Sequence, residues 1–128
     1  MIVVILDDSM TVRLTIEAYL DELGVDECDI FSTDDGEEAL EYISEHGADI
    51  IFSDLYMPKM DGELFVDNLL RIDPKLVSRL FVISGVEDNS EFDSVKKAGA
   101  KRFIKKPINR EHFNHFVKPE ILKKNKLT

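Results

Sequence analysis

The sequence predicts a single α/β domain built on a five-stranded parallel sheet with helices on both faces. Five short apolar runs alternate with segments whose apolar residues recur at helical spacing. A length of 128 residues is enough for one domain with a substantial core. Because β-α-β crossovers are right-handed, this alternation implies a doubly wound sheet whose strands are buried on both faces.

The first part of the chain contains two β-α units. Residues 2–6 form a continuous apolar run, and apolar residues then recur at helical spacing over 12–23. Gly24 suits the position just past the end of that helix, because glycine adopts positive φ angles at low cost. A second short strand is expected at 30–33, followed by a helix over 37–45.

The third strand is expected at 50–54, a buried run that stops at Asp54. The turn after it holds a Met-Pro pair and an Asp-Gly pair, and both pairs favour a change of chain direction. A helix with an apolar face over 64–70 comes next. The Asp73-Pro74 pair ends this helix, since a residue that precedes proline disfavours helical geometry.

The last two strands are expected at 80–83 and 102–104, and both are short apolar runs. Between them lies a polar helix over 92–98, whose apolar pattern is weaker. Asn109 has the side chain of a helix N-cap and is expected to open the final helix. The sequence thus contains five β-α units in succession.

The final helix is expected to end or kink near Lys118. Pro119 has no N–H group, and its ring would clash with the carbonyl oxygen of His115 in a continuous helix. We therefore assign residues 1–118 to the folded domain and residues 119–128 to a C-terminal tail or the start of a linker.

Charge is distributed unevenly along the chain. Residues 1–95 contain 24 of the 26 acidic residues and 5 of the 16 basic residues. The net charge of −10, and the lack of a motif that interleaves aromatic and basic residues, argue against direct binding of nucleic acid. No apolar run approaches the ~18 residues of a membrane span, and Cys28 alone cannot form an internal disulfide. We expect a cytoplasmic protein.

Polar side chains follow four of the predicted strands at their carboxyl ends: Asp7 and Asp8, Asp54, Ser84, and the pair Lys105 and Lys106. In a parallel sheet these ends meet at one edge, so three carboxylates, a hydroxyl and an ammonium are expected to converge. Such carboxylates need a raised pKa or a bound cation, and oxygen ligands without His or Cys favour Mg²⁺. A phosphoryl group at Asp54 would then meet the metal on one side and lysine on the other.

These motifs resemble the receiver domain of two-component response regulators, from Ile2 to about Val117. The matching residues are Asp7-Asp8, the stretch Asp54-x-x-Met57-Pro58-x-x-Asp61-Gly62, Ser84, and Lys106-Pro107. Each motif is weak alone, whereas all four in order at successive strand ends are highly specific. The resemblance implies a flavodoxin-like (βα)5 fold with strand order 2-1-3-4-5.

The resemblance implies that Asp54 is the phosphoacceptor. A sensor histidine kinase, a phosphotransfer protein or a small phosphodonor would supply the phosphoryl group in a Mg²⁺-dependent reaction. Asp8, Asp54 and the backbone carbonyl of Tyr56 would bind the metal, and Asp7 would act through a coordinated water. By the same resemblance, the domain catalyses its own phosphorylation and dephosphorylation without being a conventional turnover enzyme.

Other residues are assigned to the response to phosphorylation. Ser84 and Lys106 would bind phosphoryl oxygens, and Phe103 matches the aromatic switch position of the family. The peptide bond before Pro107 is expected to be cis, and Gly62 forms part of the turn after the acceptor. Phosphorylation would then shift the population between two existing conformations.

The resemblance places the output surface on the fourth helix, fifth strand and fifth helix. This surface carries five basic residues: Lys96, Lys97, Lys101, Arg102 and Lys105. The output protein, or a fused effector domain, is therefore expected to be acidic where it docks, and dimerisation through this surface stays open. Tyr56 and Val86 resemble positions that flank the hydrolytic water, and their side chains predict a slow loss of phosphate.

Two other functional classes share features with this sequence. A Mg²⁺-dependent phosphohydrolase of the haloacid dehalogenase type also uses an aspartyl nucleophile, but an acid/base aspartate stands where this chain has Tyr56. A phosphorylation-independent interaction module would keep the fold without the chemistry. Every residue that phosphorylation needs is present, so the sequence favours the phosphoacceptor.

Overall fold

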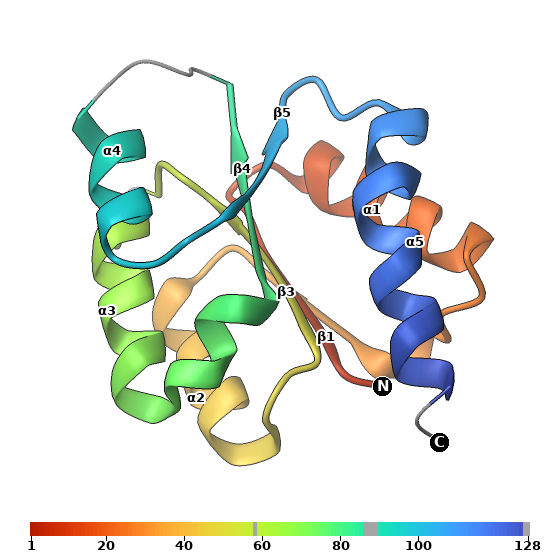
Figure 1. Cartoon of the computed structure of the whole chain (residues 1–128), viewed down its shortest axis with the longest axis horizontal. Helices are drawn as coiled ribbons and strands as arrows, with labels where there is room; N and C mark the ends of the chain where they lie inside the picture. The colour runs from red at the N-terminus through yellow and green to blue at the C-terminus, as the bar shows by residue number, and fades with distance from the viewer. Residues whose placement is uncertain (58, 86–89, 127–128) are drawn as a thin grey trace.

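A computed structural model describes residues 1–57, 59–85 and 90–126 of the chain. Five parallel strands form one sheet in the order β2-β1-β3-β4-β5 (Figure 1). The strands are β1 (Val3–Leu6), β2 (Ile30–Thr33), β3 (Ile50–Asp54), β4 (Leu80–Ser84) and β5 (Arg102–Lys105). The flavodoxin-like order that the resemblance implied is confirmed.

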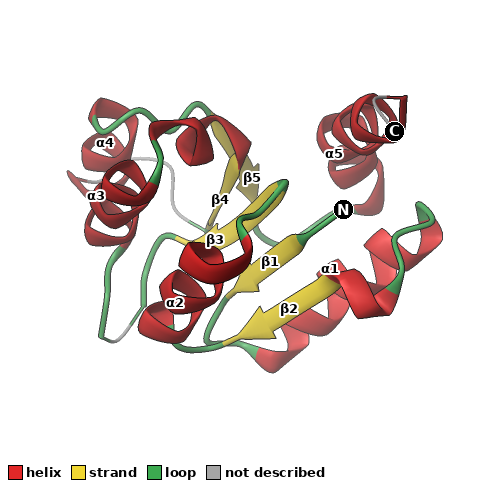
Figure 2. Ribbon diagram, turned by 90° about the horizontal axis from the view of Figure 1, so that it is seen from below, coloured by secondary structure: helices red, strands yellow, loops and turns green. Residues whose placement is uncertain are grey.

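Helices connect the strands and cover both faces of the sheet. They are α1 (Met10–Glu22), α2 (Gly36–His46), α3 (Gly62–Ile72), α4 (Ser90–Lys97) and α5 (Arg110–Lys126). Helices α1 and α5 lie on one face, whereas α2, α3 and α4 lie on the other (Figure 2). Among the described residues, no helix is long and apolar enough to cross a membrane.

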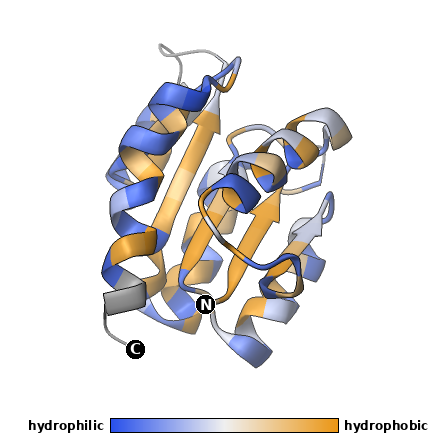
Figure 3. Cartoon of the chain, turned by 90° about the vertical axis from the view of Figure 1, so that its right-hand side faces the viewer, coloured by the Kyte–Doolittle hydropathy of each residue, from blue (hydrophilic) through white to orange (hydrophobic). Residues whose placement is uncertain are grey.

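Each face of the sheet has its own core because successive strand residues point to opposite sides. In β1, Val3 and Ile5 face α1 and α5, while Val4 and Leu6 face the other three helices. All four are fully buried. The strands are mainly apolar and the outer surfaces of the helices are mainly polar (Figure 3), the pattern of a sheet that is covered on both sides.

Most of the predicted helix ends are confirmed. Asn109 accepts hydrogen bonds through Oδ1 from the backbone N–H groups of Glu111 and His112, at 2.8 and 3.3 Å, so it caps α5. Gly24 has a φ of +90° directly after the C-cap residue of α1. Two short 3₁₀ helices, Glu27–Asp29 and Pro74–Arg79, were not predicted.

Helix α5 differs from the expectation at its C-terminal end. We expected it to end or kink near Lys118. It does not end there, but continues through Pro119 to Lys126. Ile121 is buried against the α1 and α5 face of the sheet, and Glu120 pairs with Arg102 of β5 at 3.0 Å. Burial of an isoleucine contributes about 1.5–3 kcal/mol, similar in size to the cost of about 3 kcal/mol for proline inside a helix.

Candidate functional site

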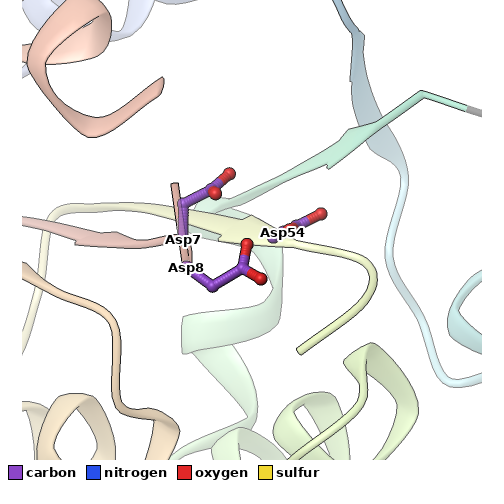
Figure 4. Close-up of side chains that lie close together, drawn as sticks. All are labelled: Asp7, Asp8 and Asp54. Atoms are coloured by element: carbon purple, nitrogen blue, oxygen red, sulfur yellow. The ribbon is translucent and has the colours of Figure 1, made fainter. Parts of the chain in front are cut away.

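Three aspartates lie together at the carboxyl ends of β1 and β3. One carboxylate oxygen from each of Asp7, Asp8 and Asp54 lies within 4.8 Å of the other two (Figure 4). Strands β1 and β3 are direct neighbours in the sheet, so the residues that follow them meet at its edge. The predicted convergence of three carboxylates is confirmed. Asp7 and Asp54 are buried, and Asp8 is exposed.

Asp54 is held at the end of a strand whose preceding residues are fully enclosed. The ladder between β3 and β4 pairs Asp54 with Ile83, and the N–H of Leu55 extends it by donating to the Ile83 carbonyl at 3.0 Å. The N–H of Tyr56 donates to Asp54 Oδ1 at 3.4 Å. These contacts fix the carboxylate of Asp54 while the side chain of Tyr56 is 47% exposed.

Asp7 is fully buried, and its N–H group and one of its carboxylate oxygens have separate hydrogen-bond partners. Its N–H donates to the carbonyl of Thr33 at 3.2 Å, and its Oδ1 accepts from the N–H of Ser9 at 2.8 Å. The second oxygen, Oδ2, makes no hydrogen bond within the described part of the chain. A buried oxygen in this state is a ready ligand for a cation.

Lys106 provides the positive charge at this edge. Its Nζ atom lies 3.4 Å from Asp7 Oδ2 and 3.4 Å from Asp54 Oδ2, so it bridges the two buried carboxylates. The backbone N–H of Lys106 donates to the carbonyl of Ser84, which places the ends of β4 and β5 side by side. One ammonium cannot neutralise three carboxylates, so the site keeps an excess of negative charge.

Burial and the neighbouring charges affect the protonation of Asp54. Burial is the largest influence, and together with the neighbouring Asp7 carboxylate it raises the pKa of Asp54 to about 6, against the opposing effect of Lys106. Burial likewise raises the pKa of Asp7, although the N–H of Ser9 and the Lys106 ammonium oppose it. The two carboxylates are less stable in their charged forms here than in water.

A bound Mg²⁺ ion would relieve this repulsion. The donor set consists of carboxylate oxygens, which a hard cation prefers, and Asp7 Oδ2 is buried without a hydrogen bond. The residues at this edge of the sheet therefore fit the cofactor that the sequence predicted. The roles assigned to the individual ligands, including the Tyr56 carbonyl, stay predictions.

Phe103 packs against helix α4. Its ring centroid lies 4.5 Å from that of Phe92, and the two planes are tilted by 39°. The ammonium of Lys96 lies 4.5 Å from the Phe92 ring centroid and 5.7 Å from that of Phe103. The predicted switch residue is thus in contact with an aromatic ring and a cation that the sequence analysis did not connect with it.

The two residues predicted to have structural roles occupy constrained positions. The Lys106–Pro107 peptide bond is cis, as expected. Gly62 begins α3, and a Cβ atom at this position would lie 3.1 Å from the Leu55 carbonyl oxygen and 3.1 Å from Val95 Cγ1. Glycine thus allows α3 to approach the loop after Asp54. Pro58 and Val86 lie outside the described residues.

Sequence reasoning missed two residues beside the aspartates. Ser9 caps α1, since its Oγ accepts from the N–H of Val12 at 3.3 Å, and a serine at the start of an apolar helical pattern could have revealed this cap. Arg13 donates from Nη1 to the backbone carbonyl of Asp7 at 2.6 Å. No pattern in the sequence indicates that second contact.

Comparison with known proteins agrees with this geometry. The family model described as "Response regulator receiver domain" matches residues 3–118. The chain is 30% identical over 121 residues to Protein PilG of Pseudomonas aeruginosa, covering 93% of this chain and 86% of that protein. It is also 30% identical over 106 residues to the Chemotaxis protein CheY of Bacillus subtilis, covering 83% and 85%.

Solved structures share the fold. The chemotaxis response regulator CheY4 of Vibrio cholerae superposes with a TM-score of 0.78 at 25% identity, covering 92% of this chain and 96% of that chain. The receiver domain of the sensor histidine kinase PA1611 from Pseudomonas aeruginosa, solved with magnesium coordinated in its active site cleft, gives 0.79 at 18% identity, covering 93% and 95%. The second likeness concerns the fold alone.

Proposed function

This chain belongs to the family of response regulator receiver domains, and from that premise we propose that Asp54 accepts a phosphoryl group in a Mg²⁺-dependent reaction. The observation that carries the proposal is the buried Asp54 carboxylate, which lies beside two further aspartates and 3.4 Å from the Lys106 ammonium. Phosphoryl transfer requires chiefly positioning and charge neutralisation, and this arrangement supports both.

In the proposed reaction the Asp54 carboxylate is the nucleophile. One of its oxygens forms a bond to phosphorus while the bond from phosphorus to the imidazole nitrogen of a phosphohistidine breaks. The leaving nitrogen keeps the electron pair and takes up a proton from solvent. Since the pKa of Asp54 is about 6, the carboxylate is mostly ionised at neutral pH and can attack. Bound Mg²⁺ supplies charge neutralisation for the phosphoryl oxygens.

The surface next to Lys106 supports docking of a phosphodonor protein. Met10 and Leu14 on α1 are 64% and 57% exposed. Beside them lies a pocket of about 230 Å³ lined by one edge of α1 and the loop after β5, with the residues Thr11, Val12, Thr15, Lys106, Pro107 and Ile108. We propose that a helix of a sensor histidine kinase or phosphotransfer protein packs here, which would bring its phosphohistidine to Asp54.

The response to phosphorylation is proposed to run through Ser84, Lys106 and Phe103. A phosphoryl group on Asp54 would give the Ser84 hydroxyl and the Lys106 ammonium new partners, and so favour one of two conformations. Phe103 lies on β5 between these groups and α4. A change in its packing would alter the surface of α4, β5 and α5 that an output protein or domain contacts.

This output surface is less uniformly basic than the sequence suggested. Arg102 is paired with Glu120, and Lys96 lies over the Phe92 ring. Lys97 and Lys101 are exposed, and Phe116 on α5 is 46% exposed. We propose an output partner that offers acidic side chains beside an apolar one. The comparisons do not favour the phosphohydrolase or the phosphorylation-independent module.

Intact mass tests the proposed chemistry. The protein is incubated with acetyl phosphate and Mg²⁺, beside an Asp54→Asn variant and a sample treated with a metal chelator. We expect one phosphoryl adduct that requires both Asp54 and the metal, and its decay after removal of the donor measures self-catalysed dephosphorylation. An adduct that persists in Asp54→Asn would contradict the assignment of the acceptor.

A further inference from the structure

The backbone carbonyl of Asp7 lies just past the end of the strand ladder. The paired residues of β1 end at Leu6, opposite Thr33 on one side and Ser53 on the other. Asp7 is fully buried, so water does not reach this carbonyl from bulk solvent. A buried carbonyl without a donor costs about 1–3 kcal/mol, and the Nη1 atom of Arg13 donates to it at 2.6 Å.

Arg13 is itself held in place by the first turn of α1. Its N–H donates to the carbonyl of Ser9 at 3.1 Å, and Ser9 also caps the helix and binds Asp7 Oδ1 through its own N–H. The segment from Asp7 to Arg13 is therefore a turn closed by two hydrogen bonds within it. One goes to the backbone carbonyl of Asp7 and the other to its carboxylate. The exposed residue Asp8 lies within this turn.

We propose that Arg13 is a positioning residue for the metal site. Its guanidinium fixes the backbone between Asp7 and Asp8, so that both carboxylates face Asp54. The contact goes to a carbonyl and occupies neither carboxylate oxygen of Asp7. This inference rests on the proposed function, since it requires that the three carboxylates bind Mg²⁺.

Charge alone predicts the opposite result. Arg13 brings a positive charge to a cluster that binds a cation, so a purely electrostatic effect would weaken Mg²⁺ binding and its removal would strengthen it. Positioning through the hydrogen bond predicts that removal weakens binding. Arg13→Met and Arg13→Gln both remove the charge and the donor at the Asp7 carbonyl, since the glutamine amide is too short to replace Nη1. Arg13→Lys keeps the charge and an N–H donor on a slightly shorter side chain. These substitutions separate the two effects.

A matched control is available in Arg79. Its Nη1 atom also donates to a backbone carbonyl, that of Ala48 at 3.0 Å, but this contact lies before the start of β3, at the opposite end of the strand from Asp54. Arg79→Met thus removes an arginine-carbonyl hydrogen bond without touching the three aspartates. It reports how far a general loss of stability changes the affinity for Mg²⁺.

The experiment is calorimetric titration of the full chain with MgCl₂, with folding of each variant verified by circular dichroism. We expect Arg13→Met to bind Mg²⁺ about 10-fold more weakly, the low end for residues that orient metal ligands. Arg13→Gln should show a similar loss, whereas Arg13→Lys and Arg79→Met are expected to stay within about 3-fold of the unchanged protein. Unaltered or tighter binding by Arg13→Met would overturn the inference.

If Arg13→Met does not fold, Arg13→Gln decides the question. Tighter or unaltered binding by Arg13→Gln would overturn the inference, whereas weaker binding that Arg13→Lys restores supports positioning by the hydrogen bond. Failure of the unchanged protein to bind Mg²⁺ would instead contradict the proposed function. The two failures are therefore distinguishable in one set of titrations.

Discussion

The backbone N–H of Lys106 donates a hydrogen bond of 2.8 Å to the carbonyl oxygen of Ser84. This bond continues the ladder between β4 and β5 past its last paired residues, Ser84 and Lys105. The two residues proposed to bind the phosphoryl group are thereby fixed to each other through the main chain. We therefore expect a displacement of one of them to move the other through this main-chain bond.

Replacement of Lys106 by methionine should slow phosphorylation of Asp54 by acetyl phosphate about 100-fold, the usual cost of removing a group that stabilises developing charge. The ammonium of Lys106 lies 3.4 Å from Asp54 Oδ2, whereas the adjacent Lys105 is exposed. Lys105→Met is the matched control and should change the rate less than about 3-fold. Equal losses in both variants, measured by intact mass over time, would contradict the assignment of Lys106.

Stability without metal should depend on the charge of Asp54. The folded-state pKa of about 6 lies above the ordinary value of 3.8, so the folded protein binds more protons than the unfolded chain between these values. Ionisation of Asp54 therefore destabilises the fold, and this effect is absent below about pH 4 and complete above about pH 6. Asp54→Asn should be more stable than the unchanged protein by about 1–3 kcal/mol at pH 7.5.

Urea denaturation with a chelator present, at pH 4 and pH 7.5, measures this difference. The advantage of Asp54→Asn should shrink towards zero at pH 4, and saturating Mg²⁺ at pH 7.5 should reduce or reverse it by stabilising the unchanged protein. An advantage of the same size at both pH values would mean that ionisation of Asp54 is not its cause.

Replacement of Gly62 by alanine should destabilise the fold by about 1–3 kcal/mol. The new methyl group would lie 3.1 Å from the Leu55 carbonyl oxygen, which is backbone and cannot rotate away. Gly36→Ala is the comparison, because its nearest neighbour is the flexible side chain of Met60. Thermal denaturation should show the larger loss for Gly62→Ala, and the reverse order would refute the backbone contact as its cause.

Ile121 tests whether α5 beyond Pro119 belongs to the folded domain. Ile121→Ala should cost about 2–4 kcal/mol, because the side chain is buried among residues of the α1 and α5 face. The next residue, Leu122, is 49% exposed, and Leu122→Ala should change stability by less than about 0.5 kcal/mol. Similar small effects of both substitutions on urea denaturation would place the domain boundary near residue 118 instead.

Periodicity identified the strands and helices because each element carries a strong local pattern. The five apolar runs form a sheet covered on both faces, in which every residue of β1, β3 and β4 is buried, and turn residues such as Gly24 and Asn109 mark helix ends by their own chemistry. The strand order itself came from resemblance, since a local pattern contains no information about which strands are neighbours.

The features that the sequence did not reveal depend on contacts between distant elements. Helix α5 continues past Pro119 because Ile121 finds a place in the core, and this tertiary contact outweighs a local preference. The position of Lys96 over Phe103 requires α4 and β5 to be adjacent. In the site, strand ends predicted Asp7, Asp8, Asp54 and the pair Lys105 and Lys106, and the resemblance selected Lys106. Arg13 was missed because its partner is a backbone carbonyl.

The strand order also predicts which strands beside the site separate from the sheet most easily in local unfolding. Strands β1 and β3, which precede the three aspartates, are each hydrogen-bonded on both sides, whereas β5 is an edge strand with one neighbour. Amide hydrogens of β1 and β3 should therefore exchange with solvent only through near-global unfolding, and those of β5 through smaller openings. Brief detachment of β5 would carry Phe103 and Lys106 away and leave the carboxylates of Asp7, Asp8 and Asp54 assembled.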